Sequence, residues 1–299
     1  MLAVVMHQTG GPEVLGLEEI ARPAPAEGEI LVRVHAVGVN PIEWKYRRGY
    51  MPKDLPAVLG SDISGVVEES RSADFAEGDE VFGFTASGGY AEFATSPAAI
   101  LARKPAGISH EQAAAIPVAA LTAWQALFDR AALQPGQTAL VAGAAGGVGH
   151  FAVQFARRAG ARAVGIGSPN NRDFVLGLGA EEYVDYKSQD VAEAVSDVDM
   201  AFDTVGGETT LSLLVTVRRG GILVTIAGAP PEDAAAERGV RAELLIMSPS
   251  SRQLADIAEL VAGGEVHVEI AETIPLAEIQ HAHALSESGH TRGKIVLRV

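Results

Sequence analysis

The stretch Ala139-Leu-Val-Ala-Gly-Ala-Ala-Gly-Gly-Val-Gly-His150 decides the fold of this chain. Its first four residues are small or apolar and are typical of a short buried strand. A glycine-rich turn follows, and residues 151–159 have the pattern of an amphipathic helix. The order strand, glycine turn, helix indicates dinucleotide binding, because the helix N-terminus offers unpaired N–H groups and a positive dipole end to a pyrophosphate.

The turn departs from a strict G-x-G-x-x-G motif. Gly146 and Gly149 align with its second and third glycines, whereas Ala144 stands at the first and Gly143 lies one residue earlier. The position between a strand and a helix therefore carries the prediction more than the glycines do. We expect the cofactor to contact the backbone of Ala144, Ala145, Gly146, Gly147, Val148 and Gly149.

Strand and helix patterns alternate from residue 137 to about 262, which predicts a parallel sheet covered on both faces. We expect strands at 138–142, 162–167, 182–185, 200–204 and 221–227, and helices at 148–159, 170–178, 189–195, 207–218 and 252–262. The fold class is thus α/β, with a doubly wound nucleotide-binding domain placed at 119–262.

The first 105 residues have a different character, with short strands between many Gly and Pro positions, as in a small barrel or sandwich. We expect strands at 2–7, 29–38, 63–68 and 80–84. Ser109 and Gln112 form a capping-box pattern that opens a helical stretch reaching residue 130. Residues 294–299 alternate like the first domain, so we expect 1–118 and 263–299 to form one β-rich domain.

Composition excludes several function classes. The net charge of −15 and the absence of a basic run argue against nucleic acid and anionic membrane surfaces as partners. No apolar run is long enough to span a membrane, and the N-terminus lacks the basic region of a signal peptide, so we expect a cytoplasmic protein. There are no cysteines and the eight histidines are scattered, so we expect no metal site.

The end of the second predicted strand indicates which dinucleotide is bound. An NAD site usually has Asp or Glu there for the ribose hydroxyls, but this chain has Ser168-Pro-Asn-Asn-Arg172. Ser168, Asn171 and Arg172 can instead donate to a 2′-phosphate, which favours NADP(H) over NAD. The alternative is that Arg172 is a solvated charge in the first turn of a helix.

Asp203 ends the fourth predicted strand, at the edge of the sheet where cofactors bind. We expect its carboxylate to hold the following loop by hydrogen bonds rather than to take part in chemistry. Thr204 and Val205 are the better candidates for cofactor contact, through backbone and methyl groups.

Further motifs run in uninterrupted order almost from end to end. They are Ala36-Val-Gly-Val-Asn-Pro-Ile-Glu-Trp-Lys45, Leu59-Gly-Ser-Asp-Ile-Ser-Gly-Val-Val67, Gly78-Asp-Glu-Val-Phe-Gly83, Gly88-Gly-Tyr-Ala-Glu92, Ala119-Ala-Leu-Thr-Ala-Trp124, Val141-Ala-Gly-Ala-Ala-Gly-Gly-Val-Gly149, Phe202-Asp-Thr-Val-Gly-Gly207 and Arg292-Gly-Lys-Ile-Val-Leu297. This set resembles the zinc-independent medium-chain dehydrogenases/reductases, in the branch of zeta-crystallin-like quinone oxidoreductases and alkenal/enone reductases. The resemblance implies a GroES-like catalytic domain with a Rossmann domain inserted, a homodimer, and NADPH-driven reduction of quinones or of enones and enals.

The resemblance also implies site residues. Zinc-dependent relatives have cysteine where Asn40 stands and Gly-His-Glu where Gly60, Ser61 and Asp62 stand, so the zinc positions are lost. The amide of Asn40 would bind the nicotinamide ribose or the substrate oxygen. Other candidate donors and cofactor contacts implied in this way are Lys45, Tyr46, Tyr50, Thr122, Ala227 and Gly228.

Two alternatives stay open at this point. One is a non-catalytic NADPH-binding redox sensor or structural protein of the same fold, and the other is an NAD-dependent alcohol dehydrogenase, which the absent metal set disfavours. The chain is shorter than typical members between residues 67 and 90 and around 228–250, which leaves the size of the substrate open.

Overall fold

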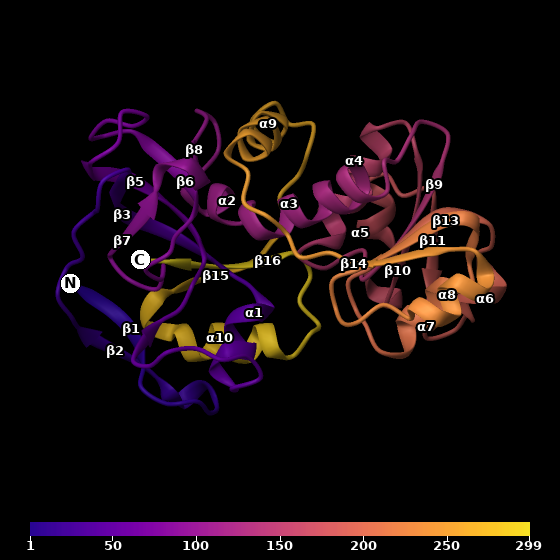
Figure 1. The fold of residues 1–299 in the computed structure, drawn as a ribbon, viewed down its shortest axis with the longest axis horizontal. Helices are drawn as coiled ribbons and strands as arrows, with labels where there is room; N and C mark the ends of the chain where they lie inside the picture. Colours follow the sequence, from indigo (N-terminus) through magenta and orange to yellow (C-terminus); the bar gives the residue numbers. More distant parts are fainter. The chain divides into compact units, whose positions relative to one another are not determined.

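The structure, a computed structural model, describes all 299 residues, and the chain divides into two compact units. Unit 1 comprises Met1–Leu121 and Pro249–Val299, and unit 2 comprises Thr122–Ser248 (Figure 1). The sequence pattern placed the second boundary at 262/263, whereas the structure places it ahead of helix α9 (Ser251–Ala262). The reason is that α9 packs on strand β8 (Leu101–Arg103) of unit 1.

Unit 1 contains two sheets. The first has the order β2-β1-β4, and the second has the order β15-β16-β3-β5-β6-β8 with β7 paired to β3. The strands are β1 (Leu2–Met6), β2 (Leu15–Glu19), β3 (Glu29–Val39), β4 (Ala57–Val58), β5 (Asp62–Ser70), β6 (Glu80–Phe84), β7 (Phe93–Pro97), β15 (Ile270–Pro275) and β16 (Lys294–Arg298). Strand β16 pairs antiparallel with β3, so the chain returns to unit 1 to complete its larger sheet, as expected.

Short helices join these strands. They are η1 (Pro12–Val14), α1 (Pro41–Arg47), η2 (Ala98–Ile100), α2 (His110–Ala114), η5 (Leu276–Glu278) and α10 (Ile279–Glu287). Helices α1 and α10 contact each other (Figure 1). The core of unit 1 is built from apolar side chains of several strands, among them Ile30, Val32, Ile63, Val81 and Ile295.

Unit 2 is a doubly wound parallel sheet in the order β11-β10-β9-β12-β13-β14. Its strands are β9 (Thr138–Ala142), β10 (Arg162–Gly167), β11 (Glu182–Asp185), β12 (Val198–Asp203), β13 (Val217–Thr225) and β14 (Arg241–Leu244). The chain moves outward from β9 to β10 and β11, and then returns to β12 on the other side of β9. The carboxyl ends of β9 and β12 therefore form a topological switch point, where such sheets bind ligands. The predicted α/β fold is confirmed.

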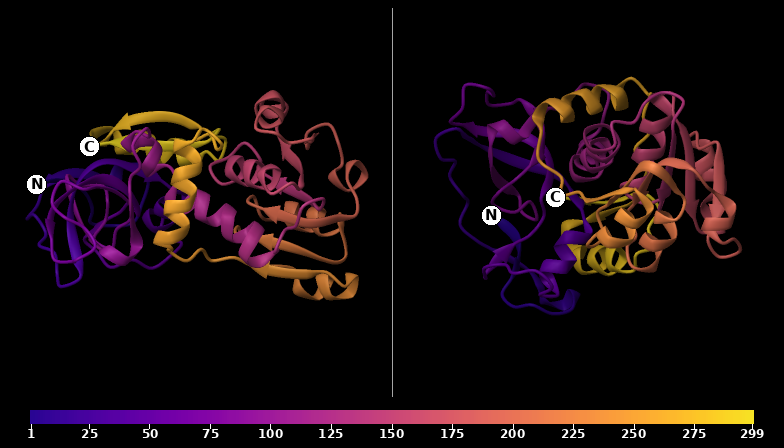
Figure 2. Two further views of the ribbon diagram at one scale, coloured as in Figure 1. Left: turned by 90° about the horizontal axis from the view of Figure 1, so that it is seen from above. Right: turned by 45° about the vertical axis from the view of Figure 1, so that its right-hand side comes forward.

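Helices cover both faces of this sheet (Figures 1 and 2). Helices α4 (Gly149–Arg158) and α5 (Arg172–Gly177) contact β9, β10 and β11, while α7 (Glu208–Leu214) and α8 (Glu232–Arg238) contact β12, β13 and β14. The boundary between the units falls within helix α3 (Pro117–Trp124), which continues as the π-helix η3 (Gln125–Arg130). The remaining helices are η4 (Pro169–Asn171) and α6 (Val191–Ala194).

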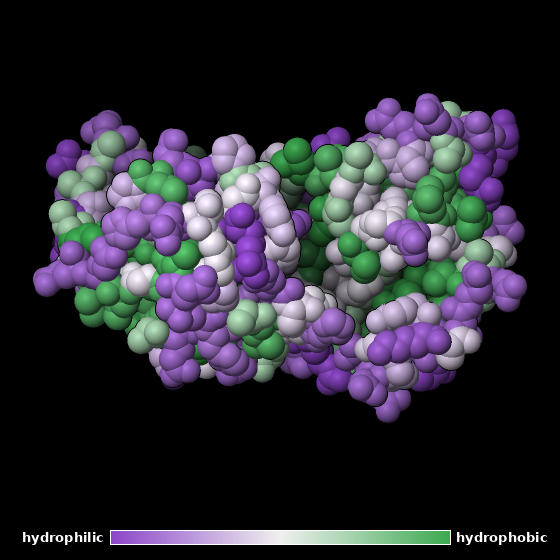
Figure 3. All heavy atoms as spheres, turned by 90° about the horizontal axis from the view of Figure 1, so that it is seen from below, coloured by the Kyte–Doolittle hydropathy of each residue, from purple (hydrophilic) through white to green (hydrophobic).

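Helix α8 and strand β14 were not predicted. Strand β14 is the last strand of the sheet and none of its four residues is fully buried, so it lacks the continuous apolar run of the inner strands. On the face drawn in Figure 3, hydrophobic and hydrophilic side chains are interspersed in both units. None of the helices is long and apolar enough to cross a membrane.

Candidate active site

The glycine turn of unit 2 brings the start of α4 close to the end of β9. Gly143 has a φ of 67°, and a Cβ added there would lie 2.5 Å from Oγ1 of Thr204, which donates to the carbonyl oxygen of Ala142 at 2.8 Å. A Cβ added at Gly149 would lie 2.2 Å from the carbonyl oxygen of Gly143. Glycine is therefore required at both positions, and Gly143, rather than the buried Ala144, supplies the left-handed backbone of the turn.

This turn fits the pyrophosphate of a dinucleotide. Gly146, Gly147 and Val148 are partly exposed and lead into α4, a helix of ten residues. The N–H groups of Gly147, Val148 and Gly149 make no hydrogen bond within the protein, whereas that of His150 donates to the carbonyl oxygen of Gly146 at 3.1 Å. The helix dipole favours an anion at this end. Val205, in the loop that follows β12, is also exposed. The turn and this loop thus lie at the switch point between β9 and β12.

Asp203 holds that loop in place. Its buried carboxylate accepts hydrogen bonds from N–H of Val205 and of Gly206, both at 2.9 Å, and from the hydroxyls of Thr210 at 2.6 Å and Thr225 at 3.2 Å. All of its acceptor capacity is directed to the protein, which confirms that Asp203 has a structural role. A Cβ added at Gly206 would lie 2.8 Å from that of Ala227, so the loops after β12 and β13 touch.

The residues predicted to select NADP(H) lie together beyond the end of β10. Asn171 donates to the hydroxyl of Ser168 at 3.2 Å, and Tyr183 donates through its hydroxyl to the carbonyl oxygen of Ser168 at 2.5 Å. The exposed guanidinium of Arg172 lies 6.0 Å from the ring centroid of Tyr183. Tyr183, which sequence reasoning did not single out, thus organises the group. Of the other predicted contacts in unit 2, Thr122 is buried and Gly228 is exposed.

In unit 1, Asn40 lies at the centre of a buried polar cluster. It precedes α1, but its side chain makes no capping hydrogen bond with the helix. Its Nδ2 instead donates to Asp62 at 3.0 Å, and its Oδ1 accepts from the ammonium of Lys294, which also donates to the carbonyl oxygen of Val39 at 3.0 Å. An ammonium only donates and a carboxylate only accepts, so these partners fix the orientation of the amide. Its second N–H makes no hydrogen bond within the protein.

Strand register assembles this cluster from distant parts of the chain. Ile295 of β16 is paired with Val39 of β3, which places Lys294 beside Asn40. Gly38 is paired with Asp62 of β5, and a Cβ at Gly38 would lie 3.1 Å from that of Asp62 and 2.3 Å from the carbonyl oxygen of Ala114. Glycine at position 38 therefore leaves the room in which the Asp62 carboxyl sits.

A second carboxyl belongs to the same cluster. Glu43 accepts the N–H of Asn40 on Oε2 at 2.6 Å and the hydroxyl of Ser61 on Oε1 at 2.9 Å. Burial raises the pKa of Glu43 to about 7, with a smaller contribution from the charge of Asp62, while Lys294 opposes the shift. Burial likewise raises the pKa of Asp62 to about 6, and burial lowers the pKa of Lys294. The Lys294 ammonium thus favours the ionised form of both buried carboxyls without forming a direct ion pair with either.

The chain is similar to known proteins over its whole length. Residues 26–106 match the family "Alcohol dehydrogenase GroES-like domain", and residues 178–297 match "Zinc-binding dehydrogenase". The chain is 32% identical to the quinone oxidoreductase of Homo sapiens, over 99% of this chain and 97% of that protein, and 30% identical to quinone oxidoreductase 1 of Escherichia coli, over 98% of each. The solved quinone oxidoreductase from Coxiella burnetii is 32% identical and superposes with a TM-score of 0.96, over 100% of this chain and 99% of that one. The structure of the Escherichia coli quinone oxidoreductase complexed with NADPH is 30% identical and has a TM-score of 0.92, over 100% of both chains.

The chain belongs to the quinone oxidoreductase family of medium-chain dehydrogenases/reductases. The family indicated by the sequence motifs is therefore confirmed.

In this chain, the Asn40 cluster does not fit a zinc ion, although one of the two matched families is described as zinc-binding. The oxygen of Asn40 is occupied by the ammonium of Lys294, whose charge would repel a dication. The cluster contains neither sulfur nor imidazole, the ligands that zinc prefers together with carboxylate. No group of three or more His, Asp or Glu side chains that could hold a metal ion occurs in the structure.

The three other candidate donors lie on α1 or just after it, outside the cluster. The Lys45 ammonium lies 5.8 Å from the ring centroid of Trp44, and the exposed ring of Tyr50 packs edge-on against Trp44 at 6.1 Å. Tyr46 packs against the core of unit 1. The structure thus does not join Lys45, Tyr46 or Tyr50 to Asn40 by side-chain hydrogen bonds. Asn40 is instead bonded to Glu43, Asp62 and Lys294, and Glu43 in turn to Ser61. None of these four residues had been assigned a role from the sequence, where Ser61 and Asp62 were noted only as lost zinc positions.

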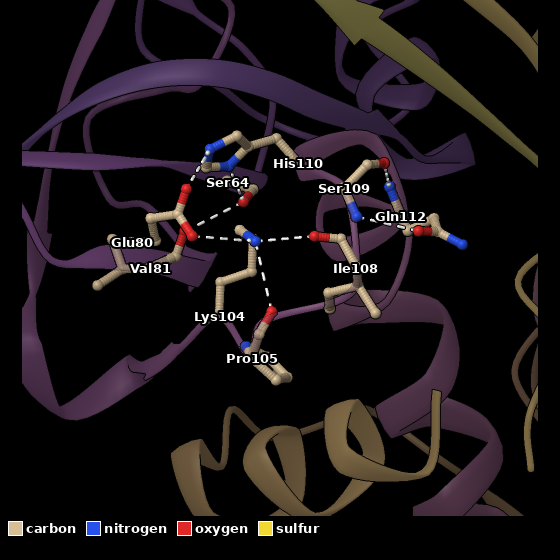
Figure 4. Close-up of polar contacts among 9 residues, drawn as sticks. All are labelled: Ser64, Glu80, Val81, Lys104, Pro105, Ile108, Ser109, His110 and Gln112. Carbon is tan, nitrogen blue, oxygen red and sulfur yellow. Dashed lines mark hydrogen bonds and ion pairs between the residues drawn. The ribbon is translucent and has the colours of Figure 1, made fainter. Parts of the chain in front are cut away.

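A second polar cluster in unit 1 has the residue types of a hydrolytic triad (Figure 4). Ser64 lies 2.8 Å from Nδ1 of His110, whose Nε2 lies 3.4 Å from Glu80, and Lys104 pairs with Glu80 at 3.1 Å. Ser64 is fully buried, however, and its hydroxyl donates to the carbonyl oxygen of Val81 at 3.1 Å. A fully buried hydroxyl cannot reach a substrate, so the cluster joins α2 to the sheet and is structural.

Proposed function

We propose that the protein is a zinc-independent, NADPH-dependent reductase of quinones or of α,β-unsaturated carbonyl compounds. When bound, NADPH supplies a hydride from its nicotinamide ring. Substrate reduction then needs a donor for the oxygen on which negative charge develops, and without a metal that donor must be an N–H or O–H group. The observation that carries the proposal is the fixed amide of Asn40, which has one N–H uncommitted.

The partners of Asn40 strengthen it as a donor. Lys294 donates to the amide oxygen and so draws electron density from the amide nitrogen. Hydrogen bonds in such a chain polarise one another, the more so in a buried site of low dielectric. An N–H polarised in this way would stabilise the oxygen of an enolate or a hydroquinone anion better than it stabilises the neutral carbonyl, which is the requirement for catalysis.

NADPH would be held by unit 2. The backbone of residues 144–149 would contact the pyrophosphate, with Thr204, Val205, Ala227 and Gly228 beside it and with Thr122 as the candidate of this unit for the nicotinamide end. Ser168, Asn171 and Arg172 would contact the 2′-phosphate. The absence of a carboxylate among residues 168–172 supports NADPH over NADH, since an acidic residue there would repel that phosphate. The Escherichia coli relative solved with NADPH supports the same choice.

We also propose a homodimer. Strand β14 lies at one edge of the unit 2 sheet and pairs only with β13, so its other side can accept the same strand of a second copy. Light scattering of the purified protein would measure the mass directly.

The enzyme proposal is tested by fluorescence titration with NADPH and NADH, followed by turnover with a panel of quinones and 2-alkenals in the presence of a metal chelator. We expect tighter binding of NADPH, turnover that the chelator does not abolish, and a loss of about 10²-fold in kcat on Asn40→Ala. Binding of NADPH without turnover of any substrate, in the wild type and in Asn40→Ala alike, would instead indicate a non-catalytic sensor.

A further inference from the structure

We propose that Ser61 is the proton donor to the reduced substrate and that Glu43 supplies the proton to Ser61. This inference rests on the proposed function, and it names the source of the proton that the hydride transfer itself does not provide. Ser61 would be the catalytic residue, because its hydroxyl would touch the substrate, and Glu43 would act through it.

The contacts of Glu43 leave a proton one route out of the cluster. Glu43 is 2% exposed, and its two oxygens have one hydrogen-bond donor each. The donor to Oε2 is the backbone N–H of Asn40, an amide that cannot pass on a proton at ordinary pH. The donor to Oε1 is the hydroxyl of Ser61, a residue that is partly exposed. A proton that leaves Glu43 therefore passes through Ser61.

The protonation state of Glu43 also determines where the Ser61 hydroxyl points. With Glu43 ionised, Ser61 donates to Oε1. With Glu43 protonated, Oε2 still accepts the N–H of Asn40, so the acidic hydrogen lies on Oε1 and is donated to Oγ of Ser61. The hydrogen of Ser61 is then free to be donated to a ligand. Protonation thus converts Ser61 from a donor to Glu43 into a donor to substrate.

The step balances for an enone. The substrate accepts the hydride at its β-carbon, and the C=C electron pair moves to give an enolate. The enolate takes the hydrogen of Ser61 as a new C–H or O–H bond, while the Ser61 oxygen takes the proton from Oε1 of Glu43. Glu43 is left as a carboxylate and recovers a proton from water before the next turnover. An enone, NADPH and one proton thus give the saturated carbonyl compound and NADP⁺.

The charged groups around Glu43 suit this role. Asp62 from β5 raises its pKa and Lys294 from β16 lowers it, while burial has the largest effect, with a resulting pKa of about 7. The Tyr90 hydroxyl, whose own pKa is raised by burial and by Glu43 and Asp62, faces the cluster from the segment before β7 and lies 3.3 Å from Nε2 of His283 on α10. The charges that act on His283 are those of Arg47 and Glu287, which form an ion pair with each other. Both forms of Glu43 are thus populated near neutral pH, as a proton donor that recharges in each turnover requires.

The experiment compares Glu43→Gln and Ser61→Ala with wild type in the reduction of a 2-alkenal between pH 5.5 and 9. The glutamine of Glu43→Gln can keep both hydrogen bonds, through its oxygen to Asn40 and its amide to Ser61, but it has no proton to give. We expect wild-type kcat to fall as the pH rises through about 7, and both variants to have kcat lowered about 10²-fold with no such dependence. Ser61→Thr retains the hydroxyl and should retain the pH dependence.

Gln112→Glu is the matched control. Gln112 closes a capping box on α2, as Glu43 does on α1, but lies outside the cluster, so the control should behave as wild type. NADPH affinity, measured by fluorescence, should be unchanged in every variant, which separates loss of the proton from loss of the fold. An active wild type whose pH dependence persists in Glu43→Gln would overturn Glu43 as the source of the proton, and with it this inference, but would leave the proposed function standing. A wild type that binds NADPH and reduces no substrate would overturn the proposed function and this inference with it.

Discussion

Replacing Glu43 by glutamine should stabilise the protein at alkaline pH and have little effect at acid pH. The pKa of Glu43 is about 7 in the folded protein against a usual value of 4.5. A raised pKa means that the folded state holds a proton which the unfolded state has released, so stability is retained below pH 4.5 and is lost as the pH rises through 7. At about 1.4 kcal/mol per pH unit, the loss over this window is about 3 kcal/mol. The glutamine side chain is neutral throughout and escapes this loss.

Because the chain has only two tryptophans, one in each unit, the unfolding of unit 1 can be measured separately by fluorescence. Trp44 lies next to Glu43 on α1, and Trp124 lies in unit 2. In a Trp124→Phe background, Trp44 fluorescence reports urea unfolding of the region around the cluster. We expect Glu43→Gln to gain about 2–3 kcal/mol over its parent between pH 5 and pH 8, with the slope against urea unchanged.

The exposed Glu27, changed to Gln, is the control and should show no gain that depends on pH. Equal effects of Glu43→Gln at pH 5 and pH 8, or a loss of stability at pH 8, would refute the conclusion that burial dominates the energetics of Glu43.

Three further predictions concern the two units separately. Lys294→Met removes the donor to Asn40 and to the carbonyl oxygen of Val39, and the positive charge that favours the ionised forms of Asp62 and Glu43. It should cost about 1–3 kcal/mol above pH 7, in the same unfolding assay, and less at pH 5 where the carboxyls are protonated. Gly149→Val places a side chain 2.2 Å from a carbonyl oxygen and should weaken NADPH binding at least tenfold by fluorescence titration, whereas Gly177→Ala, in open space on α5, should not change it. Arg172→Glu should reduce the ratio of NADPH to NADH affinity by about tenfold, since one charge-assisted contact to the 2′-phosphate is replaced by repulsion; an unchanged ratio would show that Arg172 is only a solvated charge.

The nucleotide-binding unit could be predicted from the sequence because its signals are local. The β9–turn–α4 segment is contiguous, and the strands expected at 138–142, 162–167 and 182–185 match β9, β10 and β11 of the structure. The role of Asp203 could also be predicted, because a carboxylate that ends a strand before a glycine-rich loop is well placed to accept the N–H groups of that loop. Strand β14 escaped prediction because an edge strand that is only partly buried carries no apolar run.

The Asn40 cluster could be predicted only in part, because its members come from strands that register brings together. Lys294 and Asn40 are 254 positions apart, and nothing local in the C-terminal strand indicates that its first residue turns inward. Glu43 did carry a local signal. Asn40 and Glu43 have the spacing of a capping box, and Pro41, between them, stands at the first helical position. This segment was not predicted to be a helix. Recognising α1 would have placed Glu43 and Arg47 on its inner face and Lys45 on another.

The burial of three ionisable side chains in one cluster needs an explanation other than stability. Burying the carboxyls of Glu43 and Asp62 with the ammonium of Lys294 does not make the folded protein more stable than apolar side chains of similar volume would. An amide presents an oxygen and a nitrogen of nearly the same size, and packing alone cannot decide between its two orientations. Here a flipped Asn40 would place its oxygen against Asp62 and its NH₂ against Lys294, so both contacts would become repulsive. The charges therefore hold Asn40 as a donor toward whatever binds beside it, which is the polarity that a reductase without a metal requires for an oxygen gaining negative charge.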